Sequence, residues 1–302
     1  MTGLIDVRFV DLYASASGVD RDVAERDIVL TYVLWMMKED GVIEDLAFKG
    51  GTSIRKIYLG RVGRFSEDLD FTLIGYDLTG LERRFTSFIE KSHRYGFTLS
   101  YDDIRKSWGV SFACDIHYSH EWNNGVFKFE VSLREDPVLE VVERGIQNEL
   151  YFKYTEFDPF EVPCMQLEEV LSEKIRATYQ RATARDVYDL YQLAFLHYDR
   201  DLVKKLAVIK FWNDRSDYDP KLLLSNVEAM KIDFSEVEYL LKNEDHPREE
   251  EIKARIIDNY GYLRELDNNL TKILRDTRKH RETTLVKRIC NDLRSQGGSA
   301  SA

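Results

Sequence analysis

The chain has 302 residues, of which 43% are hydrophobic and 32% are charged, the composition of a soluble globular protein long enough for two domains. Its net charge of −11 excludes a general attraction to nucleic acid or to an anionic membrane, so any such contact needs a local basic patch. Cys114, Cys164 and Cys290 have neither zinc-site nor disulfide-framework spacing. With no signal peptide and no membrane-spanning apolar stretch, we expect a cytoplasmic protein without membrane contact.

The first predicted element is an amphipathic helix that starts after Asp20 and ends near Gly41. A short strand over 46–49 then meets the pair Gly50-Gly51, and apolar positions at helical spacing follow it. This order predicts a strand, a tight glycine turn and a helix. Downstream, alternating patterns predict strands over 68–73, 97–101, 110–117 and 126–133, with a helix over 81–95.

After Pro159 and Pro163 the pattern becomes almost wholly helical, so we expect one domain over 1–163 and a helical domain over 164–302. Lys174 lies on the apolar stripe of a predicted helix. Its ammonium therefore either extends to the edge of the helix or reaches an enclosed anionic site, and we favour the second. The segment 272–294 carries eight basic and three acidic residues, which indicates a solvated helix face or, alternatively, an RNA-contacting arm.

The glycine turn has the features of a phosphate-binding loop. Glycines let a backbone approach a ligand closely, and backbone N–H groups at the start of a helix favour an anion. Thr52 and Ser53 add hydroxyl groups, and Lys56 adds a cation one helical turn later. Paired glycines also occur in ordinary turns, so this signal needs support from elsewhere in the chain.

That support is the sequence Asp68-Leu69-Asp70. Two carboxylates one residue apart on a strand project from the same face, with Cα atoms roughly 6.5–7 Å apart. Like charges repel there unless a cation lies between them, and Mg²⁺ is bound by one or two carboxylates together with substrate phosphates. The alternative for an isolated pair is a solvent-exposed strand face.

The chain contains, in this order, the segments FKGGTSIRKIY, RFSEDLDF, LEEVLSEKIRATYQR and ARDVYDLYQL. These four segments resemble the successive motifs of the AbiEii toxin family of nucleotidyltransferases, which has a polymerase-β-like core. The resemblance runs from about Glu25 to about Leu193 and implies an α+β fold, in which a mixed sheet with helices precedes an all-helical C-terminal domain.

The resemblance also implies roles for matching residues. The triphosphate is expected on Gly50, Gly51, Thr52 and Ser53, magnesium on Asp68 and Asp70, and the nucleotide phosphates near Lys174. Asp186 is expected as a further essential acid, so that the helical domain contributes Lys174 and Asp186 to the cleft. Ser66 matches a hydroxyl position that is phosphorylated in some members. Arg64, more than Arg55, is a further candidate for phosphate contact, and Glu130 is a candidate third metal ligand.

The function implied is transfer of a nucleoside monophosphate, from a pyrimidine NTP, onto the 3′ end of tRNA or another RNA. This transfer blocks aminoacylation and arrests growth, and a cognate antitoxin neutralises it. Two alternatives stay open. The same site could modify a protein or a small molecule, since the core serves different acceptors, or the chain could be a non-catalytic nucleotide-binding regulator.

Overall fold

The computed structural model describes residues 5–75, 77–102, 104–107, 109–242 and 247–297. The chain divides into two compact units. Unit 1 is Met1–Pro137, Val141–Cys164 and Tyr239–Asp245, and unit 2 is Val138–Glu140, Met165–Glu238 and His246–Ala302. The chain therefore passes between the units more than once, and the single boundary after residue 163 remains a prediction.

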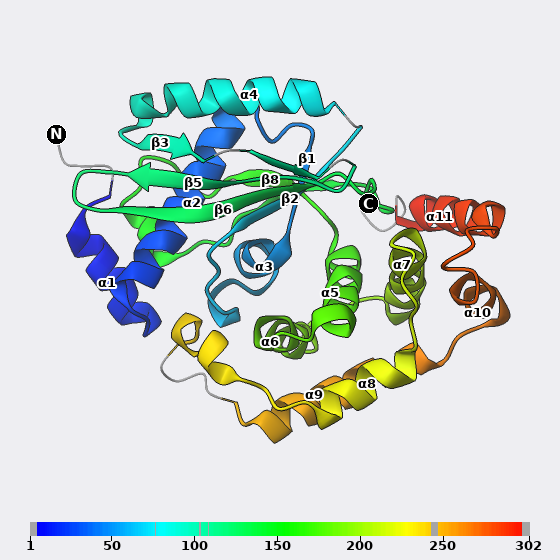
Figure 1. Ribbon diagram of the computed structural model, residues 1–302. Coiled ribbons are helices and arrows are strands. Elements are labelled where there is room, and N and C mark those ends of the chain that lie inside the picture. Colours follow the sequence, from blue (N-terminus) through cyan, green and yellow to red (C-terminus); the bar gives the residue numbers. More distant parts are fainter. Residues whose placement is uncertain (1–4, 76, 103, 108, 243–246, 298–302) are drawn as a thin grey trace. The chain divides into compact units, whose positions relative to one another are not determined.

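The described residues of unit 1 contain eight strands that form one mixed sheet (Figure 1). The strand order is β3-β5-β6-β2-β1-β8-β7, and β4 pairs with β5. The central strand β2 is antiparallel to β1 and parallel to β6. The strands are β1 (Leu46–Lys49), β2 (Leu69–Leu73), β3 (Thr98–Tyr101), β4 (Arg105–Ser107), β5 (Ser111–Ser119), β6 (Asn124–Ser132), β7 (Val142–Gly145) and β8 (Glu161–Cys164).

Alternation of buried and half-buried residues accounts for the central strands. Leu69 and Phe71 of β2 are buried in the unit 1 core with Phe129 of β6, whereas Asp70 between them is only half-buried. Each strand therefore presents an apolar face to the core and a polar face away from it. The predicted strands at 46–49, 68–73, 97–101, 110–117 and 126–133 all correspond to observed strands.

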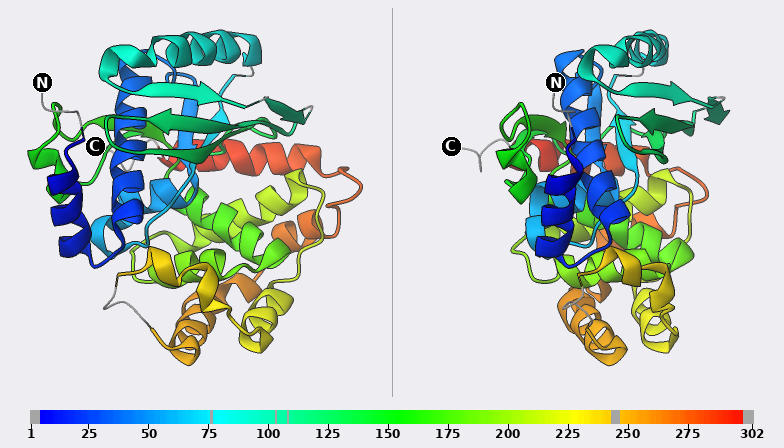
Figure 2. Two further views of the ribbon diagram at one scale, coloured as in Figure 1. Left: turned by 60° about the vertical axis from the view of Figure 1, so that its left-hand side comes forward. Right: turned by 90° about the vertical axis from the view of Figure 1, so that its left-hand side faces the viewer.

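Three long helices complete unit 1: α1 (Val7–Ser17), α2 (Arg21–Glu39) and α4 (Leu78–Lys91). Helix α4 lies along one face of the sheet, and the short helix α3 (Gly50–Ser53) lies on the other (Figures 1 and 2). The structure confirms the helix predicted after Asp20. It also shows α1, which the sequence analysis did not predict, with Phe9 and Tyr13 buried.

Strands β7 and β8 were also not predicted. Pro163, which the sequence analysis places at the change to a helical pattern, lies inside β8 and pairs in register with Glu143 of β7. Three of the four residues of β7 are exposed, so the segment shows no apolar alternation, and β8 contains Pro163, a residue that argues against a strand. They extend the sheet beyond β1 on the side away from β2.

Unit 2 is helical throughout its described secondary structure, which confirms the predicted sheet-containing part followed by a helical part. Its helices are α5 (Leu167–Arg181), α6 (Ala184–Leu193), α7 (Arg200–Asn213), α8 (Pro220–Ala229), α9 (Glu249–Tyr260), α10 (Asn268–Leu274) and α11 (Thr283–Gly297). One of its cores joins α7, α10 and α11 to Val138 and Leu139. None of the described helices has the length and apolar character that crossing a bilayer requires.

Candidate active site

The glycine turn joins β1 to α3, and its first glycine is in direct contact with an acid of the sheet. Gly50 has φ +77°, a conformation that L side chains rarely adopt. A Cβ atom at this position would lie 2.3 Å from Asp70 Oδ2. Only glycine therefore allows Asp70 to pack against the turn.

The second glycine is covered by the segment that leads into the acids. A Cβ atom on Gly51 would lie 2.8 Å from Arg64 Nη2 and 3.0 Å from Ser66 Oγ. Arg64 is buried and donates a hydrogen bond to the Phe65 carbonyl at 2.9 Å. Arg64 and Ser66 thus lie at the turn, where the sequence analysis expected a phosphate contact and a phosphorylated hydroxyl.

Asp68 directly precedes β2, and Asp70 is the second residue of that strand. The two side chains are half-buried, and alternation along a strand gives them the same face. The Thr52 hydroxyl donates to the Asp68 carbonyl, which ties the turn to the backbone of the acid pair. Ser53 Oγ is buried and has no hydrogen-bond partner among the described residues. The turn therefore keeps a buried hydroxyl group that no described residue satisfies.

Glu130 on β6 is the in-register neighbour of Asp70. Its side chain accepts a hydrogen bond from Lys128. Partial burial disfavours the charged form of Lys128, but Glu130, Asp70 and Asp68 outweigh this effect and raise the pKa of Lys128. Lys128 thus responds to the negative potential of all three carboxylates.

The described residues contain no group of three His, Cys, Asp or Glu side chains arranged to hold a metal ion. Glu130 as a third ligand beside Asp68 and Asp70 remains a prediction. The two aspartates still fit magnesium, because they are oxygen donors on one face of one strand, and Mg²⁺ commonly uses one or two carboxylates with substrate phosphates.

A pocket of about 420 Å³ lies beside Asp68 and is lined further by residues of β5 and β6. Its lining is ionic, with more carboxylates than cations. The lining residues are Arg26, Glu67, Asp68, Asp102, Asp115, His117, Val126, Phe127 and Lys128. Asp68 therefore lies at the wall of a hollow rather than in a packed core.

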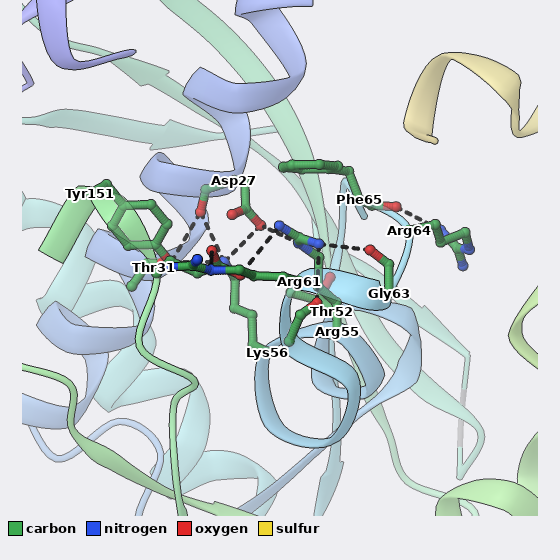
Figure 3. A network of polar contacts seen from close by, with 12 residues as sticks. Asp27, Thr31, Thr52, Arg55, Lys56, Arg61, Gly63, Arg64, Phe65 and Tyr151 are labelled. Carbon is green, nitrogen blue, oxygen red and sulfur yellow. Dashed lines mark hydrogen bonds and ion pairs between the residues drawn. The ribbon is translucent and has the colours of Figure 1, made fainter. Parts of the chain in front are cut away.

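Lys56 does not belong to this turn. Its ammonium lies 2.8 Å from Asp27 Oδ1 and 2.7 Å from Thr31 Oγ1, and the side chain is 2% exposed. Figure 3 shows Lys56 directed into this network with Tyr151. The expectation that Lys56 binds the nucleotide is therefore replaced by a structural role, because a buried ammonium paired with a carboxylate is not available to a phosphate.

Arg55 is likewise internal. Its Nε lies 3.4 Å from Asp27 Oδ1, and its side chain is buried. The guanidinium donates to the Gly63 carbonyl at 2.7 Å and to the Tyr13 hydroxyl at 2.9 Å. Burial raises the pKa of Asp27, but Lys56 and Arg55 outweigh it, so that this pKa is lowered. Arg55 thereby fixes the loop that leads to Arg64 (Figure 3).

A segment from far along the chain holds the residues just before the acid pair. The Phe65 amide donates to the Leu240 carbonyl at 2.9 Å. Glu67 accepts from the Tyr239 hydroxyl at 2.7 Å and from Arg26 at 3.0 Å. The backbone between Arg64 and Asp68 is thus fixed from two directions within unit 1.

In unit 2, the structure brings together Lys174 of α5 and the two acids of α6. Lys174 Nζ lies 2.9 Å from Asp186 Oδ1 and 2.7 Å from Asp189 Oδ2. Lys174 is 9% exposed and both acids are almost fully buried. The prediction that Lys174 points inward with its apolar neighbours is confirmed.

Asp186 is the most heavily bonded of these groups. It also accepts from Arg181 Nε at 2.6 Å and from the Thr183 hydroxyl at 2.8 Å. Although burial raises the pKa of this carboxyl, Lys174 and Arg181 hold it well below its usual range. Asp186 is therefore an anion at neutral pH that orients Lys174, and a poor proton acceptor.

Sequence reasoning missed Asp189. Its spacing of three residues from Asp186, one helical turn, was a usable signal, because acids at that spacing share a helix face. It also missed Asp27, whose partners Arg55 and Lys56 lie on a different element. No local pattern links those positions.

The fold and the site define a class of protein before any closer assignment. The structure is similar to MenT4, a nucleotidyltransferase toxin from Mycobacterium tuberculosis, with a TM-score of 0.79 and 24% identity over 96% of this chain and 99% of that one. Two Helicobacter pylori proteins match at TM-scores of 0.47 and 0.48, with 19% and 21% identity over 89% and 82% of this chain and 99% and 98% of theirs. No curated protein matches. The chain thus has the fold of a nucleotidyltransferase toxin.

The family model of the AbiEii nucleotidyl transferase toxins of type IV toxin–antitoxin systems matches residues 34–283. The chain belongs to this family, which confirms the resemblance drawn from its four motifs. Membership implies a nucleoside triphosphate substrate and an antitoxin partner.

Proposed function

We propose that this toxin transfers a nucleoside monophosphate, from a pyrimidine triphosphate, onto the 3′ end of tRNA and that its antitoxin neutralises this activity. The observation that carries the proposal is the contact between the Gly50 turn and Asp70, which a single Cβ atom would abolish. A turn and a carboxylate packed this closely can hold a triphosphate and its cation together.

Asp68 and Asp70 are the residues we propose to hold Mg²⁺, which when bound neutralises phosphate charge and makes the acceptor hydroxyl more acidic. Gly51, Ser53 and Arg64 bind the triphosphate through backbone N–H, hydroxyl and guanidinium groups. The acceptor hydroxyl would lose its proton to solvent water, its oxygen would attack the α-phosphorus in line, and the bond from that phosphorus to the departing pyrophosphate would break. The family resemblance also assigns Lys174 of unit 2 to the nucleotide phosphates; its ammonium is held by Asp186 and Asp189, so a phosphate would have to replace one of these partners.

The first test removes the charges of the acid pair. Asp68→Asn and Asp70→Asn preserve side-chain shape, and each should lower transfer from an α-labelled NTP to tRNA by at least about 100-fold, in the range of a lost catalytic electrostatic contact. Asp22→Asn, on the exposed surface of α2, is the matched control and should retain activity. Full activity in both acid variants would refute the assignment.

The acceptor and the base are tested together. Wild-type protein is incubated with each labelled NTP and either total RNA or total protein from the host. We expect label in the RNA fraction, at 3′ ends of tRNA, with CTP or UTP. Label confined to protein would support the alternative acceptor, and NTP-dependent stabilisation without any product would support the non-catalytic alternative.

We further propose that phosphorylation of Ser66 switches the enzyme off. Ser66 Oγ lies against Gly51, close to Arg64, so a phosphoryl group there would occupy the position of the triphosphate and neutralise Arg64. Ser66→Glu should abolish transfer, whereas Ser66→Ala should retain it, and mass spectrometry of the chain from its host should detect the modified residue. Equal activity in both variants would contradict the switch.

A further inference from the structure

The segment 272–294 concentrates positive charge in a protein of net charge −11. Two of its three acids add little negative charge to the surface. Asp276 is buried, and Glu282 pairs with Lys272 at 2.8 Å. Five exposed cations have no ion-pair partner among the described residues, and we call them the basic surface: Arg275, Lys279, Arg281, Lys287 and Arg288. The segment therefore has the local positive excess that the whole chain lacks.

The loop between α10 and α11, which carries three of these cations, is internally fixed. Asp276 accepts hydrogen bonds from Trp212 Nε1 at 3.2 Å and from the Glu282 amide at 2.8 Å. His280 has φ +51° and stacks on Trp212 with ring centroids 3.9 Å apart. The charges are thus presented from an ordered turn rather than from a loose tail, which lowers the entropic cost of binding.

Helix α11 presents the remaining cations on its outward side. Val286 and Leu293 pack into the core that contains Trp212. Lys287 and Arg288 are exposed, because they fall outside this apolar stripe. Figure 1 shows α10 and α11 joined directly by the loop, so the basic surface comes from one continuous part of unit 2.

The composition of the surface favours nucleic acid over a protein partner. Three of the five cations are arginines, whose planar guanidinium matches phosphate oxygens, and the exposed Thr283 and Thr284 add hydroxyl donors. Protein interfaces need apolar anchors at their centre. None of the large exposed hydrophobic residues among the described positions lies in 272–294.

We propose that the basic surface binds the phosphate backbone of the RNA acceptor. This inference rests on the proposed function and adds a docking site remote in sequence from every catalytic motif. Because the surface offers no exposed aromatic ring for base stacking, recognition there is independent of sequence. It supplies affinity and orientation, while the acid pair performs the chemistry.

The test compares two charge-matched variants of the full chain. One replaces the five cations of the basic surface with glutamine. The other replaces five exposed cations elsewhere with glutamine, namely Arg83, Lys91, Lys153, Lys221 and Arg248. Binding of fluorescently labelled tRNA is measured by anisotropy between about 50 and 200 mM salt, where phosphate contacts dominate the salt dependence.

We expect the basic-surface variant to bind tRNA at least about tenfold more weakly at low salt, and its log–log salt slope to fall by about 3–4. The control should change neither value, and both variants should keep the wild-type melting-temperature rise with NTP and Mg²⁺. Unchanged tRNA affinity and slope in the basic-surface variant, or equal losses in both variants, would overturn the proposal. So would unchanged tRNA binding with lost binding of the antitoxin.

The two proposals fail in different ways. If wild-type protein labels a protein rather than RNA, the acceptor assignment fails first, whatever the variants do. If wild-type protein extends tRNA but the basic-surface variant does so with an unchanged KM for tRNA, only the docking site is wrong.

Discussion

The approach of Asp70 to the turn depends on one missing atom. Gly50 leaves room for a carboxylate oxygen where any other residue would place Cβ. The same is true on a smaller scale at Gly51, where the neighbours are the movable ends of Arg64 and Ser66. Activity should therefore be more sensitive to substitution at the first glycine than at the second.

Gly50→Ala has a close control in Gly75→Ala. Both glycines have φ near +75°, but a Cβ on Gly75 meets no described atom within 4 Å. Backbone strain alone should cost Gly75→Ala about 1 kcal/mol of unfolding free energy, with transfer activity kept. Gly50→Ala adds the clash with Asp70, and we expect transfer to fall below detection. Urea unfolding and label transfer measure both effects, and similar activity in the two variants would contradict this account.

Individual residues also show how far the sequence could lead. Asp68, Asp70 and the glycines were predictable because strand alternation and turn chemistry act over a few positions. The position of Lys56 was not, because its partner Asp27 lies 29 positions earlier on a helix that is buried along most of its length. A buried ion pair between residues far apart in the chain produces no periodic pattern in the sequence.

At the scale of elements, ion pairs connect α5 and α6. Lys174 from α5 contacts Asp186 and Asp189 from α6, and Asp186 also accepts hydrogen bonds from Arg181 at the end of α5 and from Thr183, which precedes α6. The amphipathic pattern predicted α5 and the inward direction of Lys174. Strands β7 and β8 were less predictable, because β7 is mostly exposed and β8 contains a proline. Their pairing is decided by the sheet that they extend.

The ion pairs between α5 and α6 make the free energy of unfolding depend on pH, and the direction of this dependence follows from Asp186. Because the pKa of Asp186 is lowered on folding, its stabilising contribution is complete above the unfolded value of about 3.9 and is lost as the pH falls through the folded value. Asp186→Asn should cost about 3 kcal/mol at pH 7, and this difference from wild type should shrink below about pH 4. Urea unfolding at several pH values measures it.

The control for this experiment is Asp292→Asn, an exposed position on α11, which should follow wild type at every pH. An Asp186→Asn deficit that stayed constant into the acid range would show that packing, not charge, holds α5 to α6.

At the scale of the whole molecule, ligand binding should be visible as stability. A nucleotide present at about 100 times its Kd adds about 2.7 kcal/mol to the unfolding free energy of the state that binds it. We expect this gain with NTP and Mg²⁺ together, and its loss when EDTA removes the metal, because Asp68 and Asp70 repel a bare triphosphate. Differential scanning fluorimetry measures the shift.

Asp68→Asn provides the internal comparison, since it should melt like wild type without ligand and lose the metal-dependent part of the shift. Equal stabilisation by NTP with Mg²⁺ and with EDTA would argue against the acid pair as the metal site.

The return of Tyr239 and Leu240 to the Phe65–Glu67 segment has a genetic consequence. Any nonsense codon upstream of position 239 removes a carbonyl and a hydroxyl that hold the backbone in front of the carboxylates. In a host cell, inactivating mutations can therefore fall over most of the reading frame. Gene copies truncated after Leu193, which keep all four motifs, should accordingly be harmless.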